Sequence, residues 1–217
     1  MKAKFISKSI QMISMKILAF GDIHSDKRKA RELAERAKKE KVDLVVITGD
    51  LTHTEFLTEG IIGPFARHGI KVLMVPGNHE SNAAVNFLEQ LYSNSKNIHG
   101  SYVIHYGLGF FGAGGANIGP NILSESEIEK LLNDSHRALL NSKRKFSKKV
   151  MVTHLHPRGT MSESFGFEGS RAIRKAIEKF QPDLALFSHI HEAAGMYDII
   201  GSSRAINVGR KGMIIDV

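Results

Sequence analysis

Short apolar runs recur through the first half of the chain, and longer amphipathic stretches separate them. The runs lie at 16–21, 43–48 and 71–75, and the stretches that suit helices lie at about 26–40, 56–68 and 82–92. A short, continuous apolar run is typical of a strand that is buried on both faces. Strands that alternate with helical segments indicate a parallel sheet with crossover helices, so this half predicts an α/β fold.

The second half has a different order of elements. Segments 101–106 and 108–113 suit paired strands, and a helical stretch follows at about 124–141. The remainder predicts a strand at 148–153, a helix at 169–180, a strand at 183–188 and short strands with turns over 194–217. We therefore expect an α/β fold in which two mixed β-sheets pack face to face with helices outside, a four-layer αββα sandwich.

The domain organisation is expected to be simple. The chain has no internal repeat and no long linker, so residues 15–217 are expected to form a single domain. Residues 1–14 are expected to be a flexible N-terminal extension, with Met15 as an alternative start. No apolar stretch reaches the roughly 18 residues that a membrane span needs. Because Lys16 interrupts the N-terminal apolar stretch and no small-residue cleavage site follows, we expect a cytoplasmic protein.

The composition limits the chemistry that the chain can carry out. Its 217 residues include no cysteine, which excludes disulfides, thiolate nucleophiles, iron–sulfur clusters and cysteine-based zinc sites. Any metal must be held by His, Asp, Glu or Asn, and the 11 histidines make such a site worth testing. The sequence contains no indication of an oligomeric state.

The net charge of +8 comes from two basic segments. Residues 1–16 and 137–149 together carry ten lysines and arginines and no acidic residue. The rest of the chain has 20 basic and 22 acidic residues, so the body of the protein is not basic. A nucleic acid is therefore an alternative partner but not the favoured one.

A glycine-rich segment, Gly107 to Gly112, matches the pattern GxGxxG. In a dinucleotide-binding fold the third glycine leads into a helix whose first turn holds the pyrophosphate. Here Gly114, Gly115 and Pro120 follow, and they do not suit a helix start. A closely packed strand and a loop are the favoured interpretation.

Five polar clusters stand at the carboxyl ends of predicted strands, where open α/β sheets bind their ligands. They are Asp22/His24, Gly49-Asp50, Gly77-Asn78-His79-Glu80, His154 and His189/His191. In extended backbone, residues two apart point to the same side, so Asp22/His24 and His189/His191 could each hold one ligand. These residue types at five strand ends predict a metal site.

The five clusters resemble the pattern of the calcineurin-like metallophosphoesterases, D-x-H, G-D, G-N-H-[DE], H and G-H-x-H, over about residues 16–193. The resemblance implies the metallo-dependent phosphatase fold and a pair of divalent ions. One ion would be held by Asp22, His24, Asp50 and His191, and the other by Asp50, Asn78, His154 and His189. Manganese is the favoured metal, with iron, zinc or nickel as alternatives.

The same resemblance implies a phosphoesterase in which a metal-bridging hydroxide attacks the phosphorus directly. His79 would be the catalytic residue that protonates or stabilises the leaving oxygen. The chain has no room for a large cap domain, which favours a phosphodiesterase acting on a small, nucleotide-like phosphoester. The alternatives are a nuclease of the same family and a non-catalytic scaffold with this fold.

The chain departs from the family pattern at two places. Ser188 replaces the glycine before His189, which is expected to alter the loop without removing a ligand. The protein-phosphatase branch has G-D-x-x-D-R-G, whereas His53 occupies the position of the aspartate that would orient His79. This difference argues against a Ser/Thr protein phosphatase. His53 is either a substrate contact or a surface residue, and His156 is interpreted as structural.

Overall fold

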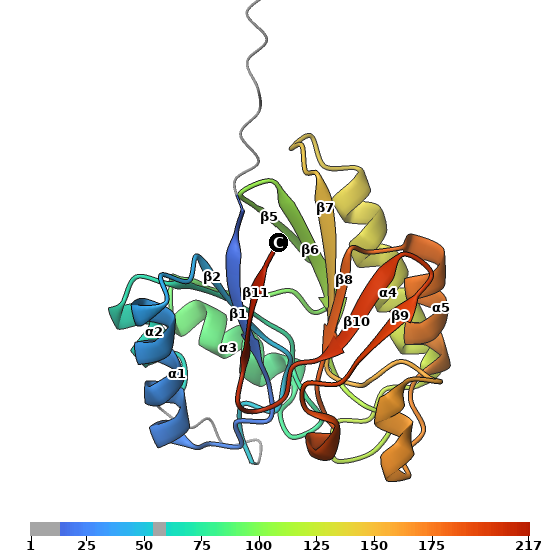
Figure 1. Cartoon of the computed structure of the whole chain (residues 1–217), viewed down its shortest axis with the longest axis horizontal. Coiled ribbons are helices and arrows are strands. Elements are labelled where there is room, and N and C mark those ends of the chain that lie inside the picture. Colours follow the sequence, from blue (N-terminus) through green and yellow to red (C-terminus); the bar gives the residue numbers. More distant parts are fainter. Residues whose placement is uncertain (1–13, 54–59) are drawn as a thin grey trace, which may run out of the picture.

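Two β-sheets lie face to face in the middle of the protein, and helices cover the outer face of each sheet (Figure 1). The structure is a computed structural model that describes residues 14–53 and 60–217. One sheet has the strand order β11-β1-β2-β3-β4, and the other has the order β5-β6-β7-β8-β10-β9. The expected αββα sandwich of two mixed sheets is confirmed.

The first sheet is parallel except at one edge. Its strands are β1 (Lys16–Phe20), β2 (Leu44–Ile47), β3 (Lys71–Met74), β4 (Ser95–Asn97) and β11 (Met213–Asp216). Strands β1 to β4 run parallel, and β11 pairs antiparallel with β1. The helices on this side are α1 (Lys27–Lys39), α2 (Gly63–Arg67) and α3 (Asn82–Leu91).

The second sheet has a parallel centre and two antiparallel edges. Its strands are β5 (Tyr102–His105), β6 (Leu108–Ala113), β7 (Lys148–Thr153), β8 (Leu184–Phe187), β9 (Tyr197–Ile200) and β10 (Ser203–Asn207). Strands β6, β7, β8 and β10 run parallel, with β5 and β9 antiparallel at the edges. Helices α4 (Glu125–Leu140) and α5 (Arg171–Phe180) cover it, and η1 (Met161–Phe165) and η2 (His191–Ala193) are short 3₁₀ turns.

The continuous apolar runs have a simple cause, because each central strand is buried on both faces. In β1, Leu18 and Phe20 pack in the same cluster as Leu33 of α1. Ile17 and Ala19 point the other way, into a core that both sheets share. A strand in this position has no solvent-facing residues, so its sequence shows no polar alternation.

The helices begin where side chains can satisfy their free N–H groups. Asp26 accepts a hydrogen bond from Lys29 N at the start of α1, and Ser81 accepts one from Ala84 N at the start of α3. Ser124 and Glu127 form a reciprocal capping box at α4. These caps fix the points at which the chain leaves the strand-end loops and enters the helices.

Some predicted elements differ from the structure. The helix expected at 56–68 is only the five-residue α2 within the described residues, and 54–59 lie outside them. Strand β4 was not expected, because its three residues, Ser-Lys-Asn, carry no apolar signal. The expected extension at 1–14 falls almost wholly outside the described residues, while Met15 is buried and exchanges two backbone hydrogen bonds with Val217.

The glycine-rich segment forms the turn after β5 and strand β6, and no helix follows it directly. A Cβ at Gly112 would lie 2.0 Å from the Val152 carbonyl oxygen, so this glycine permits close packing of β6 against β7. The interpretation as a closely packed strand is confirmed. Among the described residues, no helix is long and apolar enough to span a membrane.

Candidate metal centre

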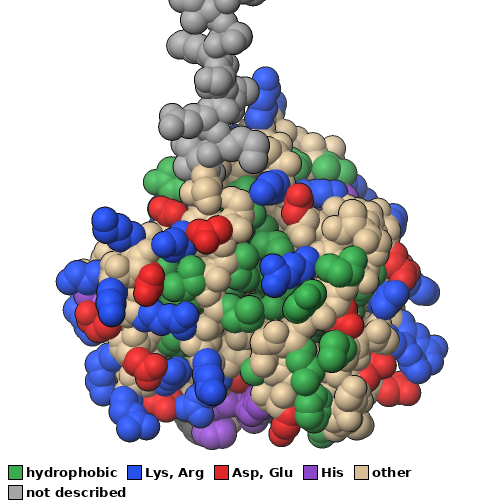
Figure 2. All heavy atoms as spheres, viewed as in Figure 1, with side chains coloured by type: hydrophobic (Ala, Val, Ile, Leu, Met, Phe, Trp, Pro, Cys, Tyr) green, Lys and Arg blue, Asp and Glu red, His purple; other side chains and the backbone are tan. Residues whose placement is uncertain are grey.

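The predicted ligands meet at one end of the molecule, because the parallel strands of both sheets end there. Asp22, Asp50 and Asn78 follow β1, β2 and β3, while His154 and His189 follow β7 and β8. In Figure 2 histidine side chains gather at the lower edge of the protein, which is the end that the carboxyl ends of these strands reach in Figure 1. The two sheets contribute to a single site.

The backbone at this site is strained. Four of the seven predicted ligands have a positive φ: Asp22 (56°), His24 (47°), Asp50 (52°) and His189 (72°). Residues other than glycine rarely adopt this region, and such strain persists where the surrounding structure enforces it, often at functional sites. The strain also shows that the chain turns here rather than continuing as a strand.

The first group of side chains comes from the ends of β1 and β8. Ligand atoms of Asp22, His24 and His191 all lie within 4.8 Å of one another. His24 Nε2 and His191 Nε2 are 3.2 Å apart, and His191 Nε2 is 3.9 Å from Asp22 Oδ1. Their nitrogen and oxygen atoms therefore point at one common position.

The second group lies beside the first and is more deeply buried. His154 Nε2 is 2.9 Å from Asn78 Oδ1 and 3.1 Å from His189 Nδ1. The other ring nitrogen of His154, Nδ1, lies 2.9 Å from the Thr48 carbonyl oxygen, which can only accept a hydrogen. That contact orients the ring so that Nε2 faces the site.

Asp50 connects the two groups. Its Oδ2 lies 3.4 Å from His154 Nε2 in the second group and 3.7 Å from His24 Nε2 in the first. A carboxylate with this position can bind two cations at once.

The expectation that residues two apart share a ligand is wrong for one of the two pairs. Asp22 and His24 lie in the same group, whereas His191 joins them and His189 joins Asp50 and His154. The positive φ of His189 and the start of η2 at His191 turn these two side chains apart. The argument assumed an extended backbone, and the strand ends before these residues.

The residues present fit a pair of divalent cations. Among the described residues, Asp22 Oδ2 is buried and has no hydrogen-bond partner. A buried carboxylate oxygen without a partner is energetically unfavourable unless a cation neutralises it. Imidazole nitrogens, carboxylates and one amide oxygen form a donor set that suits Mn, Fe or Zn better than Ca.

Burial and charge set the protonation of these groups. Burial lowers the pKa of His24 to about 4 and that of His189 to about 3, so both rings are neutral at neutral pH, as ligation requires. Burial opposes ionisation of Asp50, but the charge and hydrogen bond of His154 outweigh it and hold the Asp50 pKa below its usual range. The Asp50 and Asp22 charges raise the pKa of His154 to about 9 against the opposing effect of burial.

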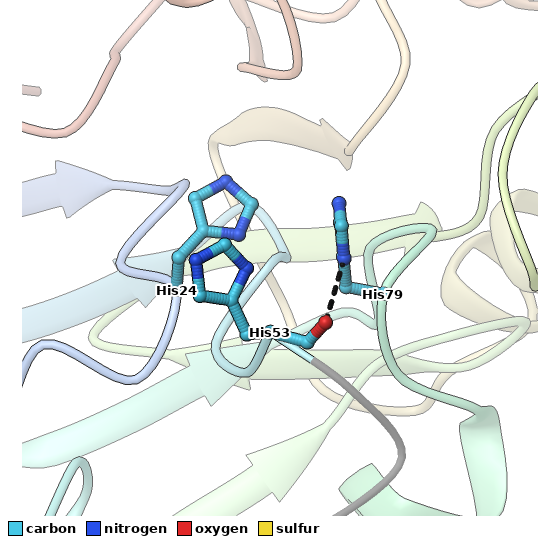
Figure 3. A group of neighbouring side chains, drawn as sticks. All are labelled: His24, His53 and His79. Carbon is cyan, nitrogen blue, oxygen red and sulfur yellow. Dashed lines mark hydrogen bonds between the residues drawn. The ribbon is translucent and has the colours of Figure 1, made fainter.

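His79 stands at the mouth of the site beside His24 and His53 (Figure 3). Its Nδ1 donates a hydrogen bond to the His53 backbone carbonyl, with an N···O distance of 3.0 Å. Its Nε2 is 3.9 Å from Asp50 Oδ2, and the side chain is 31% exposed. The backbone carbonyl of His53 therefore orients the His79 ring.

The side chains of His53 and His156 have different surroundings. The His53 ring lies tilted beside the His24 ring, with 4.9 Å between the ring centroids, so it is part of the mouth of the site. His156 is fully buried and its Nε2 lies 3.1 Å from the Phe167 carbonyl oxygen, which holds the loop after β7. Ser188 Oγ donates to the Thr48 carbonyl (3.3 Å) and lies 3.4 Å from His154 Nδ1, the ring nitrogen that does not face the other ligands.

The comparisons with known proteins agree with this geometry. The family model of the calcineurin-like phosphoesterases matches residues 15–193, which include every strand-end cluster. The chain belongs to the calcineurin-like phosphoesterase family. It is thus a hydrolase that acts on phosphoester bonds.

Individual family members and structures extend this result. A probable cyclic nucleotide phosphodiesterase from Vesicomyosocius okutanii subsp. Calyptogena okutanii (strain HA) is 25% identical over 176 residues, covering 76% of this chain and 69% of that protein. A Thermus thermophilus protein of known structure has a TM-score of 0.72 at 17% identity, covering 94% of this chain and 99% of that one. A dimetal phosphatase from Danio rerio has a TM-score of 0.61 at 12% identity, covering 89% and 86%. The two structures show that the fold is shared.

Glu80, the last residue of the family's G-N-H-[DE] motif, has a function that sequence analysis missed. Its carboxylate is buried and accepts hydrogen bonds from Gly77 N (2.8 Å), Leu51 N (3.2 Å) and Thr52 N (3.2 Å). It therefore ties the loop after β2, which carries Asp50, to the loop after β3, which carries Asn78. Its motif position gave no indication of this function, because its partners include residues 28 and 29 positions away.

Proposed function

We propose that the protein is a phosphodiesterase that uses two divalent metal ions. Asp22, His24, Asp50 and His191 would hold one ion, and Asp50, Asn78, His154 and His189 would hold the other. The observation that supports this most directly is the position of Asp50, whose Oδ2 lies within 3.4 to 3.7 Å of a histidine nitrogen in each group. When bound, such ions supply an activated water and positive charge for the phosphoryl oxygens.

The protein's own residues would orient the substrate and handle protons. With Nδ1–H engaged by the His53 carbonyl, His79 presents Nε2 to the site, and in the doubly protonated ring this atom can pass a proton to the leaving oxygen. The side chain is partly exposed, so it can reach a substrate that arrives from solvent. Mn is the favoured metal, and Fe, Zn and Ni fit the same donors.

A small, nucleotide-like phosphodiester is the proposed substrate class. The relative whose printed name is a probable cyclic nucleotide phosphodiesterase supports it. The nuclease alternative rests on the basic run at 137–149, but Lys148 and Lys149 begin β7 whereas His154 follows its other end. At about 3.3 Å per residue, roughly 20 Å separates this run from the site. The scaffold alternative is less favoured because all seven predicted ligands are present and converge.

The test compares hydrolysis of bis(p-nitrophenyl) phosphate and p-nitrophenyl phosphate with Mn, Fe, Zn, Ni and Mg. We expect metal-dependent activity with a preference for the diester, and bound metal that elemental analysis counts near two ions per chain. Asp50→Ala should lose both activity and most of the metal. His79→Ala should retain the metal while turnover falls by about 10²-fold or more. Equal activity in wild type and Asp50→Ala would refute the mechanism.

A further inference from the structure

A cavity of about 650 Å³ opens directly beside the metal centre. The start of α1, the loop after β10 and η2 line it, and His191 forms part of both the cavity wall and the first ligand group. The His191 side chain is 54% exposed and belongs to both, so the cavity adjoins the first ligand group. This volume lies within the usual range for small-molecule sites, and it suits a ligand of about the size of a nucleotide.

The cavity wall carries four cationic side chains: Arg28, Lys29, Arg210 and Lys211. Two of them are neutralised within the wall, because Lys29 pairs with Glu32 at 2.6 Å and Arg210 pairs with Asp26. Among residues 14–53 and 60–217, Arg28 and Lys211 form no direct ion pair, although the Arg28 charge helps to lower the pKa of Asp26, and both side chains are exposed. Two cations beside the site of phosphate chemistry are therefore available to an anionic ligand.

The segment that carries Arg210 and Lys211 is held in place by hydrogen bonds. Arg36 of α1 donates to the carbonyl oxygens of Lys211 (3.2 Å) and Gly212 (3.0 Å). At the other end of the segment, Gly21 N donates to the Gly209 carbonyl at 3.2 Å. A binding surface that is already ordered loses less entropy when a ligand binds, so the backbone of this part of the wall is preorganised.

We propose that this cavity binds a second phosphate of the substrate, and that the preferred substrate is a phosphodiester in which one ester group carries a further phosphate. This inference rests on the proposed function, because it places the scissile phosphate at the metal centre. Arg28 and Lys211 would contact the second phosphate through charge-assisted hydrogen bonds. Glu192, the remaining carboxylate of the wall, suits a hydroxyl donor such as that of a sugar between the two phosphates.

The reaction itself remains hydrolysis. Water adds to the scissile phosphorus, the bond from phosphorus to the leaving oxygen breaks, and that oxygen takes up a proton. The second phosphate stays on its ester group throughout. The cavity therefore changes which diester is hydrolysed rather than the chemistry.

The test uses a matched pair of substrates, thymidine 5′-(p-nitrophenyl phosphate) and the same compound with a 3′-phosphate. In the wild type we expect kcat/KM to be about tenfold higher for the 3′-phosphorylated substrate, and we expect this ratio to fall as salt rises. Arg28→Gln with Lys211→Gln should bring the ratio close to one. Lys38→Gln removes an exposed charge from the same helix about 15 Å away and should leave the ratio as in the wild type.

A binding measurement separates failure of this inference from failure of the proposed function. Calorimetry of the protein with Mn²⁺ should show about tenfold tighter binding of thymidine 3′,5′-bisphosphate than of thymidine 5′-monophosphate, and the double variant should lose the difference. If neither ester is hydrolysed, the proposed function fails. The ratio of the two binding affinities then decides by itself whether the cavity binds a second phosphate. A wild-type ratio near one, or a ratio that the double variant retains, would overturn the inference.

Discussion

Replacing Glu80 by glutamine tests whether one buried carboxylate holds the two central loops of the site together. Oε1 accepts from Leu51 N and Gly77 N, and Oε2 accepts from Thr52 N and Thr52 Oγ1. Glutamine keeps only one acceptor oxygen. With that oxygen in the place of Oε1, the NH₂ group would face the Thr52 N–H and hydroxyl, which now donate to Oε2.

The magnitude follows from these contacts. If the amide oxygen keeps the Leu51 and Gly77 bonds, Thr52 N–H loses the hydrogen bond to Oε2, and such losses cost about 1–3 kcal/mol each. Burial and the Asp50 charge both raise the pKa of Glu80, so the charge is itself costly to bury and its removal returns part of this loss. We expect Glu80→Gln to reduce the free energy of unfolding by about 2 kcal/mol. Because Asp50 and Asn78 then lose their common support, metal affinity should fall by roughly tenfold.

Urea unfolding of the protein after its metal has been removed with a chelator measures the change in unfolding free energy. A metal titration measures the change in metal affinity. Glu163→Gln is the matched control, because Glu163 accepts one hydrogen bond through Oε1, from Gly169 N at 2.8 Å, and an amide oxygen can keep it. The control should change the unfolding free energy by less than about 0.5 kcal/mol. If Glu80→Gln were as stable as the control and bound metal as tightly as wild type, the two loops would not depend on this carboxylate.

Two further predictions follow from the packing. In Gly77→Ala the new Cβ would lie 1.9 Å from Asp50 Oδ1, so the variant should lose metal binding and about 3 kcal/mol of stability, whereas Gly63→Ala, whose nearest neighbour would be 3.4 Å away, should unfold like wild type. Retained metal binding in Gly77→Ala would contradict the close approach. Burial lowers the pKa of His99 to about 4, whereas in the unfolded chain its pKa is about 6.5. As the pH falls from 6.5 to 4, the unfolded chain therefore binds a proton at His99 before the folded protein does, and the folded protein loses stability. Between pH 7 and pH 4.5 wild type should lose about 2 kcal/mol more stability than His99→Gln, and parallel pH profiles of the two proteins would disprove this.

Much of the fold was predictable because its signals are local. The buried strands of both sheets were found from short apolar runs, and the long helices from their amphipathic pattern. Strand β4 gave no such signal, since it is held partly by Asn97, whose side chain donates to Asn82 and Asn86 of α3. Contacts of that kind depend on how α3 packs beside the strand and cannot be recognised from three polar residues.

The family motif predicted the residues of the proposed site and their division into two groups, but not the backbone geometry that separates the groups. The motif spacing indicated all seven ligand candidates, and the structure brings them together. The pairing of His189 with His191 was wrong because left-handed backbone at His189 ends the extended geometry. The orientation of His79 was also hidden, because a backbone carbonyl provides it and any residue at position 53 could supply that atom.

The sequence by itself determined the types of secondary structure and the chemical types of the donor groups. Both depend on residues close together in the chain, where periodicity and the ends of strands carry the information. Only the tertiary structure decided how closely these donors approach, since His24 Nε2 and His191 Nε2 come within 3.2 Å from places 167 residues apart. That approach depends on two sheets meeting face to face. The cavity with Arg28 and Lys211 likewise forms between segments that are far apart in the sequence. Packing of both faces of each sheet sets these distances, and no local pattern contains them.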